Sequence, residues 1–119
     1  MIFFHIVDDY YLQGILAKMK QISWWETNAP DKKYKHDYVV ALFMHAFSWT
    51  FLVMLPILIA FSFNPPLWYF FMFITNVGVH GLVDDLKCNR FKLNLIQDQL
   101  IHIIQILLTW GIYLLWIFI

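Results

Sequence analysis

Histidine and aspartate recur as pairs four residues apart in three separate parts of this 119-residue sequence. The pairs are His5 with Asp9, His80 with Asp84, and Asp98 with His102. On a helix, residues at this spacing lie on the same face, so each pair would present an imidazole and a carboxylate together. His45 adds a fourth imidazole. Imidazole and carboxylate are the ligand types that zinc, manganese or iron bind in proteins, so the pattern indicates a metal site.

Long apolar stretches must position these pairs, because 61% of the residues are hydrophobic and only 13% are charged. A chain this short could not bury so much apolar surface in water, whereas about 20 apolar residues suffice to cross a bilayer. We therefore expect an all-α, integral membrane four-helix bundle that forms a single transmembrane domain over residues 1–119. Its expected spans are residues 2–18, 38–63, 67–86 and 93–119. The uncharged link Asn64-Pro65-Pro66 predicts a helical hairpin between the second and third spans.

All eight basic residues lie in two connecting segments, residues 18–37 and 87–93. By the positive-inside bias these loops would be cytoplasmic, which would place both termini outside. The formal net charge is zero, so the sequence offers no basic footprint for nucleic acid. The single cysteine, Cys88, excludes an internal disulfide and a cysteine-rich zinc ribbon.

Charged groups are costly in hydrocarbon, at roughly 2.5–3.5 kcal/mol for a central aspartate, so each is expected to have a partner or a function. Counted at 1.5 Å per residue from the basic loops, the histidines and aspartates of the four spans share the cytoplasmic half of the membrane. We expect seven of them to converge on one or two divalent ions: His5, Asp9, His45, His80, Asp84, Asp98 and His102. Gln13, Lys87 and Gln99 would orient ligands or substrate. Asp8 and Asp85 are expected to contact water or a basic neighbour near an interface.

A divalent ion with an open coordination position could support attack of water on an ester or phosphodiester. The first functional hypothesis is therefore a membrane-embedded metal-dependent hydrolase acting on a lipid or other amphiphile. Either Asp9 or Asp98 would act as general base. The expected partners are membrane lipid and further copies of the chain, which could close a cavity.

Two alternatives belong to other classes. A small transporter or channel would use the histidines and aspartates to relay protons or to pass a divalent cation. A phage holin-like or membrane-interaction protein would not need the histidines at all. Haem ligation by His45 and His102 is disfavoured because the neighbouring aspartates suit an apolar macrocycle poorly.

The order of these residues resembles a family of small polytopic membrane proteins from bacteria and their phages, known as domain of unknown function 3307. The motifs that carry the resemblance are His5-Asp9-Gln13, His45, His80-Asp84-Lys87 and Asp98-Gln99-His102, in this order over nearly the whole chain. The doubled acidic pairs Asp8-Asp9 and Asp84-Asp85 depart from the family pattern. The resemblance implies that the seven residues belong to one site, and that the protein is a multi-pass protein of the bacterial cytoplasmic (inner) membrane. The family has no established reaction. Its pattern of histidines and aspartates is similar in style to that of membrane-bound metal-dependent hydrolases, and for the hydrolase hypothesis this similarity is an analogy only.

Overall fold

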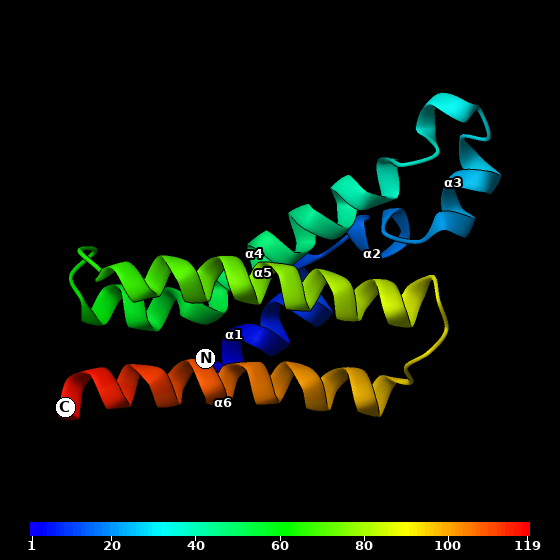
Figure 1. The fold of residues 1–119 in the computed structure, drawn as a ribbon. Helices are drawn as coiled ribbons and strands as arrows, with labels where there is room; N and C mark the ends of the chain where they lie inside the picture. Colours follow the sequence, from blue (N-terminus) through cyan, green and yellow to red (C-terminus); the bar gives the residue numbers. More distant parts are fainter.

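A computed structural model describes residues 1–119 and contains helices and connecting turns but no strand. The elements are α1 (Ile2–Val7), the π-helix η1 (Asp8–Leu12), α2 (Leu16–Met19), α3 (Ile22–Asn28), the 3₁₀-helix η2 (Lys32–Tyr34), α4 (Asp37–Ala60), α5 (Leu67–Cys88) and α6 (Leu95–Phe118). This confirms the all-α class. Three long helices form the body, with α5 packed against both α4 and α6, and α1 packed against α4 (Figure 1).

The predicted helical hairpin is confirmed at residues 61–66, where the chain turns back between α4 and α5. Ser62 and Phe63 have φ angles of 51° and 61°, and the Phe63 amide donates to the Leu58 carbonyl at 3.0 Å. Left-handed residues of this kind commonly terminate helices and satisfy the last carbonyls. Pro66 then forms the N-cap of α5. The α4 helix continues through Pro56.

The prediction of one continuous span over residues 2–18 is wrong. Helical structure stops after Leu12, and Gly14 adopts a φ of +52° before α2 begins. Glycine reaches this conformation at no steric cost. Together α1 and η1 are about 17 Å long, which is shorter than the roughly 30 Å of a hydrocarbon core. Met1 also packs against the buried residues Trp49, Val53 and Ile106, beside the middle of α6 (Figure 1), and this does not match an N-terminus beyond the far membrane face.

The interior of the protein is unusually polar and its surface unusually apolar. Of 22 buried residues, 12 are polar or charged, whereas 35 large hydrophobic side chains are exposed. Two segments, Lys32–Ala60 and Leu95–Phe118, are long and apolar enough to cross a membrane. An ordinary soluble monomer exposes few contiguous apolar patches of this kind, so the distribution favours an apolar surrounding.

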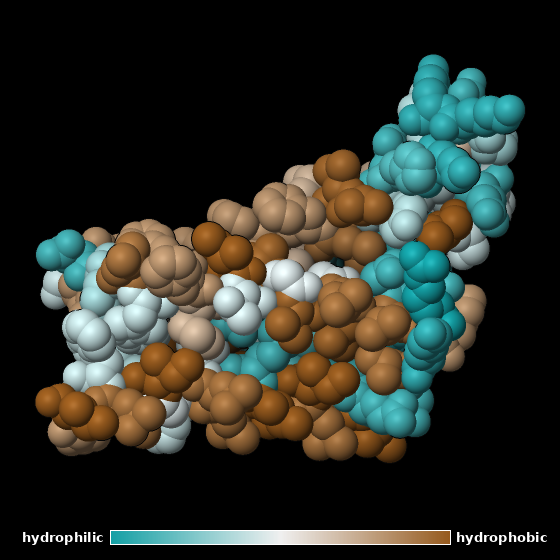
Figure 2. All heavy atoms as spheres, in the orientation of Figure 1, coloured by the Kyte–Doolittle hydropathy of each residue, from teal (hydrophilic) through white to brown (hydrophobic).

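The two basic segments come together at one end of the molecule. Residues 18–37, predicted as a loop, contain the second half of α2 together with α3 and η2, and they lie at the same end as the α5–α6 connection (Figure 1). Figure 2 shows hydrophilic residues gathered at this end, while most of the visible length of the body is hydrophobic.

Candidate metal centre

The structure brings all seven predicted residues together in the interior. They come from α1 (His5), η1 (Asp9), α4 (His45), α5 (His80 and Asp84) and α6 (Asp98 and His102). Their side chains are at most 9% exposed. The start of α6 is fixed by a capping box, in which Asn94 and Gln97 each accept a hydrogen bond from the other's backbone amide. This cap sets the rotation of the first turn, which carries Asp98.

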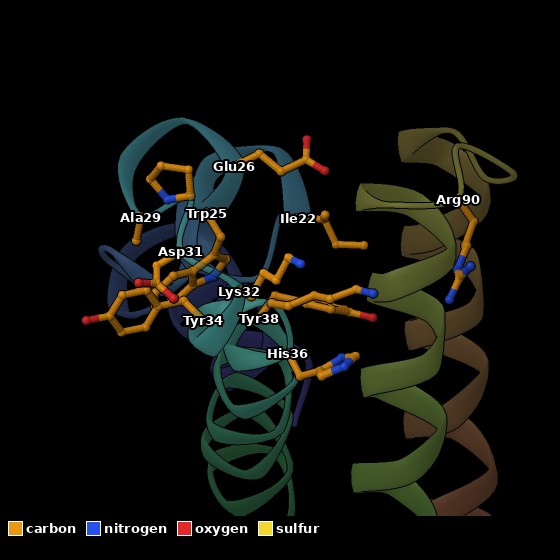
Figure 3. A pocket seen from close by; sticks show the side chains of 12 residues that line it. Ile22, Trp25, Glu26, Ala29, Asp31, Lys32, Tyr34, His36, Tyr38 and Arg90 are labelled. Atoms are coloured by element: carbon orange, nitrogen blue, oxygen red, sulfur yellow. The ribbon is translucent and has the colours of Figure 1, made fainter.

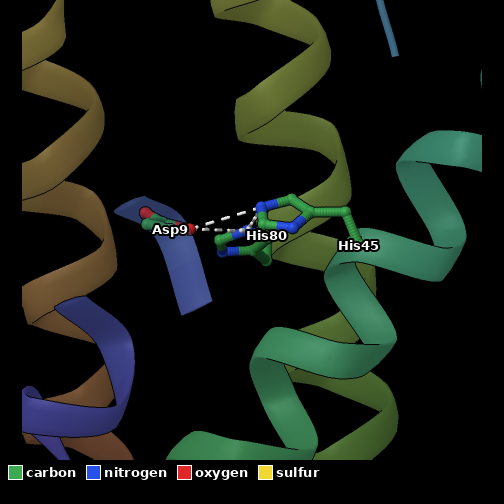
Figure 4. Close-up of side chains that lie close together, drawn as sticks. All are labelled: Asp9, His45 and His80. Atoms are coloured by element: carbon green, nitrogen blue, oxygen red, sulfur yellow. Dashed lines mark hydrogen bonds and ion pairs between the residues drawn. The ribbon is translucent and has the colours of Figure 1, made fainter. Parts of the chain in front are cut away.

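Three ligand atoms converge most closely at the centre of the cluster (Figure 4). His45 Nε2 lies 3.2 Å from His80 Nε2 and 3.3 Å from Asp9 Oδ1, and His80 Nε2 lies 3.9 Å from the same oxygen. Ligands bound at 2.0–2.1 Å around a tetrahedral ion are separated by about 3.3 Å. These separations therefore fit three ligands of one divalent ion.

Asp84 joins this triad to a second one. Its Oδ2 atom lies 3.4 Å from His45 Nε2 and 3.8 Å from His80 Nε2, and its Oδ1 atom lies 3.5 Å from His102 Nε2. His80, Asp84 and His102 likewise offer ligand atoms within 4.8 Å of one another. The His80 ring stacks against both Trp49 and His102, with ring centroids 4.2 and 4.1 Å away. His80 belongs to both triads, so an ion in either one would use it.

Several buried polar atoms in the cluster have no hydrogen-bond partner, although an unpaired polar atom in the interior costs roughly 1–3 kcal/mol. The unpaired atoms within the cluster are Asp8 Oδ2, Asp9 Oδ1, His45 Nδ1, His80 Nδ1, Asp98 Oδ1 and His102 Nε2. Elsewhere in the chain only Thr50 and Trp68 carry such an atom. Among these atoms, Asp9 Oδ1 belongs to the first triad and His102 Nε2 to the second, so each triad contains an unpaired ligand atom that a bound ion would satisfy.

The three predicted helper residues all contact the cluster. Gln99 donates to Asp98 Oδ2 at 2.9 Å, and its oxygen lies 3.0 Å from His5 Nε2. Lys87 forms an ion pair with Asp98 at 2.9 Å. Gln13 donates to the Asp9 carbonyl. These contacts fix the orientation of groups whose remaining atoms face the centre.

His5 lies at the edge of the cluster, and both of its ring nitrogens are engaged. The indole Nε1 of Trp49 donates to His5 Nδ1 at 2.8 Å, while His5 Nε2 faces Gln99. Nothing in the sequence pattern identified Trp49, because a tryptophan in an apolar span is ordinary. With both ring nitrogens engaged, His5 is less suited to bind an ion directly than the other three imidazoles of the cluster.

Lys20 is a second residue that the sequence reasoning missed. It lies in the predicted basic loop, but its side chain is 7% exposed and its ammonium lies 2.7 Å from Asp84 Oδ2. Lys20 also donates to Gln13 Oε1 at 3.0 Å. A buried cation therefore already partners one carboxylate of the cluster.

The expectation that Asp8 contacts water or a basic neighbour near an interface is wrong. Asp8 is completely buried, accepts a hydrogen bond from Ser48 at 2.6 Å, and lies 3.4 Å from His45 Nδ1. It begins the π-helical turn η1, a rare geometry that recurs at functional sites, and this turn places two successive aspartates against His45. Asp85 does have its expected basic neighbour, Arg90, at 3.4 Å.

A chain of uncharged polar groups continues from the cluster toward the middle of α6. His102 Nδ1 lies 3.1 Å from Gln105 Oε1, Gln105 donates to the Asn76 side chain at 3.2 Å, and Asn76 donates to Thr109 at 2.8 Å. All these groups are buried. The polar interior therefore extends beyond the ionisable residues, but with neutral groups only.

Comparison with family models, with curated proteins and with solved structures finds no match for this chain. The geometry of the cluster itself is therefore the basis for interpreting its function.

Proposed function

We propose that this chain is a membrane protein that holds a divalent metal ion between Asp9, His45 and His80, with Asp84 as a further ligand. The observation that carries this proposal is the charge balance of the interior. Four aspartates lie in the cluster, namely Asp8, Asp9, Asp84 and Asp98, and two lysines pair with them, Lys20 and Lys87. With the imidazoles neutral, as metal ligation requires, two negative charges remain, and burying unpaired charge is strongly unfavourable. One divalent cation would neutralise them.

The membrane setting is supported by the distribution of polarity. Exposed apolar side chains cover the long helices, while the charged cluster is enclosed between them. Lipid can cover this surface without the cost that water would impose. The cytoplasmic side of the basic end, the bacterial inner membrane and the resemblance to domain of unknown function 3307 are parts of this proposal.

The activity we propose for this site is hydrolysis of an ester or phosphoester in a lipid. A bound divalent ion supplies Lewis-acid chemistry and makes water a better nucleophile. Asp9 faces His45 and His80, which leaves Asp98 as the carboxylate for general-base work. Its Oδ1 atom lies 3.2 Å from His102 Nε2 and has no hydrogen-bond partner, while Lys87 and Gln99 hold its other oxygen.

One observation favours passage of a cation as a second candidate function. The polar chain through Gln105, Asn76 and Thr109 continues from His102 along the interior of the bundle. Neutral oxygen atoms at such positions could receive a cation leaving the cluster. In this case Asp98→Asn would reduce cation flux into liposomes, whereas under the hydrolase proposal it would abolish ester cleavage and leave metal content unchanged.

The test of metal binding is elemental analysis of protein purified from membranes without chelators. We expect stoichiometric zinc, manganese or iron, and we expect His45→Gln to lose it. His36→Gln is the matched control, because His36 is exposed and is the one histidine outside the cluster. Circular dichroism of both variants establishes that each retains its helices.

Wild-type protein without stoichiometric metal would contradict the proposal, as would a His45→Gln variant that keeps its metal while folded. Resistance of the wild-type protein to extraction from membranes by alkaline carbonate tests the membrane setting separately. Release by this treatment would contradict that setting.

A further inference from the structure

A second site lies away from the metal cluster, at the basic end of the molecule. A cleft of about 410 Å³ is bounded by α3, η2, the start of α4 and the residue Arg90 that follows α5 (Figure 3). Three basic side chains line it, Lys32, Lys35 and Arg90, and His36 lies beside them. In Figure 3, Lys32 and His36 point toward the side of the cleft on which Arg90 lies. The proposed metal chemistry uses none of these residues.

The wall of the cleft combines these cations with aromatic rings and two carboxylates. Trp25 and Tyr34 stack with centroids 6.3 Å apart, and Tyr38 also contributes to the lining. Asp31 is engaged in capping η2 through the Lys33 amide, whereas the Glu26 carboxylate also lines the cleft and takes no part in that cap. Arg90 makes one contact with Asp85, at 3.4 Å, and this leaves most of its guanidinium donors free. The cleft thus offers donors to an anion, and an acceptor to a neighbouring hydroxyl.

The cleft adjoins an apolar groove of about 300 Å³ between α4 and α5, and Tyr38 lines both. Val39, Phe43, Val77 and Leu82 lie along this groove, and Asp85, the partner of Arg90, is its one charged lining residue. Gly78 also lines it, and a Cβ atom placed there would meet nothing within 4 Å. Gly78 therefore does not serve close approach of the helices, and its missing side chain leaves the groove open.

We propose that the cleft and the groove together bind one anionic phospholipid whose headgroup carries hydroxyls. The phosphodiester would lie between Lys32, Lys35 and Arg90, a headgroup hydroxyl would donate to Glu26, and an acyl chain would occupy the groove beside Gly78. Aromatic side chains at the headgroup level and basic side chains near an anionic leaflet are the usual means of such recognition. This inference rests on the membrane setting of the proposed function and not on the bound metal.

The test is native mass spectrometry of the full chain released from nanodiscs that contain equal amounts of phosphatidylglycerol and phosphatidylcholine. The wild type is expected to retain phosphatidylglycerol preferentially, and the triple variant Lys32→Gln, Lys35→Gln, Arg90→Gln is expected to lose this preference. The matched control is Lys18→Gln, Lys33→Gln, Lys92→Gln. It removes the same charge from the same two segments at exposed residues that do not line the cleft, and it is expected to behave as the wild type.

A second pair of variants tests the groove without changing charge. Gly78→Leu would fill the groove and is expected to reduce retention of phosphatidylglycerol by about 10-fold, as the loss of roughly 1.4 kcal/mol of binding free energy implies. Gly111→Leu, at another open helical glycine outside both cavities, is expected to leave retention unchanged.

Equal loss of phosphatidylglycerol in the two triple variants would overturn the inference, because binding would then follow net charge alone. Equal retention of the two lipids by the wild type would also overturn it. Displacement of the lipid by millimolar inorganic phosphate would identify a soluble phosphate as the ligand and overturn the lipid assignment. Failure of the wild type to associate with membranes would instead refute the proposed function, so the two failures can be told apart.

Discussion

The ion pair between Lys20 and Asp84 gives a sharp test of the charge balance in the cluster. The ammonium and carboxylate lie 2.7 Å apart, and their side chains are 7% and 4% exposed. Removing one partner of a buried pair typically costs about 3–5 kcal/mol, because the other charge stays buried without compensation. We therefore expect Lys20→Met to lower the free energy of unfolding of the metal-free protein by about 3 kcal/mol or more.

A second substitution should reverse part of this loss. In Lys20→Met, Asp84→Asn the uncompensated charge is gone, and a neutral amide can still accept hydrogen bonds from neighbouring imidazoles. We expect the double variant to be more stable than Lys20→Met alone by about 0.5–3 kcal/mol, which is the range of coupling energies between contacting residues. Lys18→Met is the control, since Lys18 is exposed in the short helix α2, whose C-cap is Lys20.

Metal should reduce the difference in stability between the Lys20→Met variant and the wild type. Lys20 lies against the Asp84 oxygen that also faces His45 and His80, so its charge opposes a cation bound there. Without Lys20, added zinc or manganese should raise stability by more than it does in the wild type. The assay is unfolding in mixed detergent micelles, followed by circular dichroism with and without metal. A Lys20→Met variant as stable as the wild type would refute the reasoning, as would a double variant no more stable than Lys20→Met alone.

Two further predictions concern residues that the structure identifies. Trp49→Phe keeps a ring against His80 but removes the donor to His5, so metal affinity measured by chelator competition should fall about 10-fold or more. Trp116→Phe, at an exposed residue, should leave the affinity unchanged. Equal affinity in the two variants would mean that the hydrogen bond to His5 does not position the site. Gly14→Ala should destabilise the protein by about 1 kcal/mol because φ is +52° there. In the same unfolding assay Gly111→Ala, at an open helical position, should be neutral or stabilising. A neutral Gly14→Ala would show that the break after η1 tolerates an ordinary residue.

Several features of this protein follow from the sequence alone. The four-residue spacing of histidine and aspartate places both groups of each pair on one helical face, because the α-helix repeats every 3.6 residues. The apolar stretches around Pro65 and Pro66 predict two helices joined by a tight turn, and α4 and α5 confirm them. Local periodicity determines both features, and it requires no knowledge of what packs against what.

Only the tertiary structure decided which groups form the interior of the cluster. Lys20 reaches Asp84 from 64 residues away, and Trp49 reaches His5 from 44 residues away. Such contacts depend on how helices rotate and slide against one another, which the spacing within one helix does not fix. The break at Gly14 and the π-helical turn that buries Asp8 also depend on this packing, because α1 must fit beside α4 instead of continuing as one long helix. Sequence thus sets the chemistry that each helix can present, while packing between helices decides which charges lose their water and must find a partner.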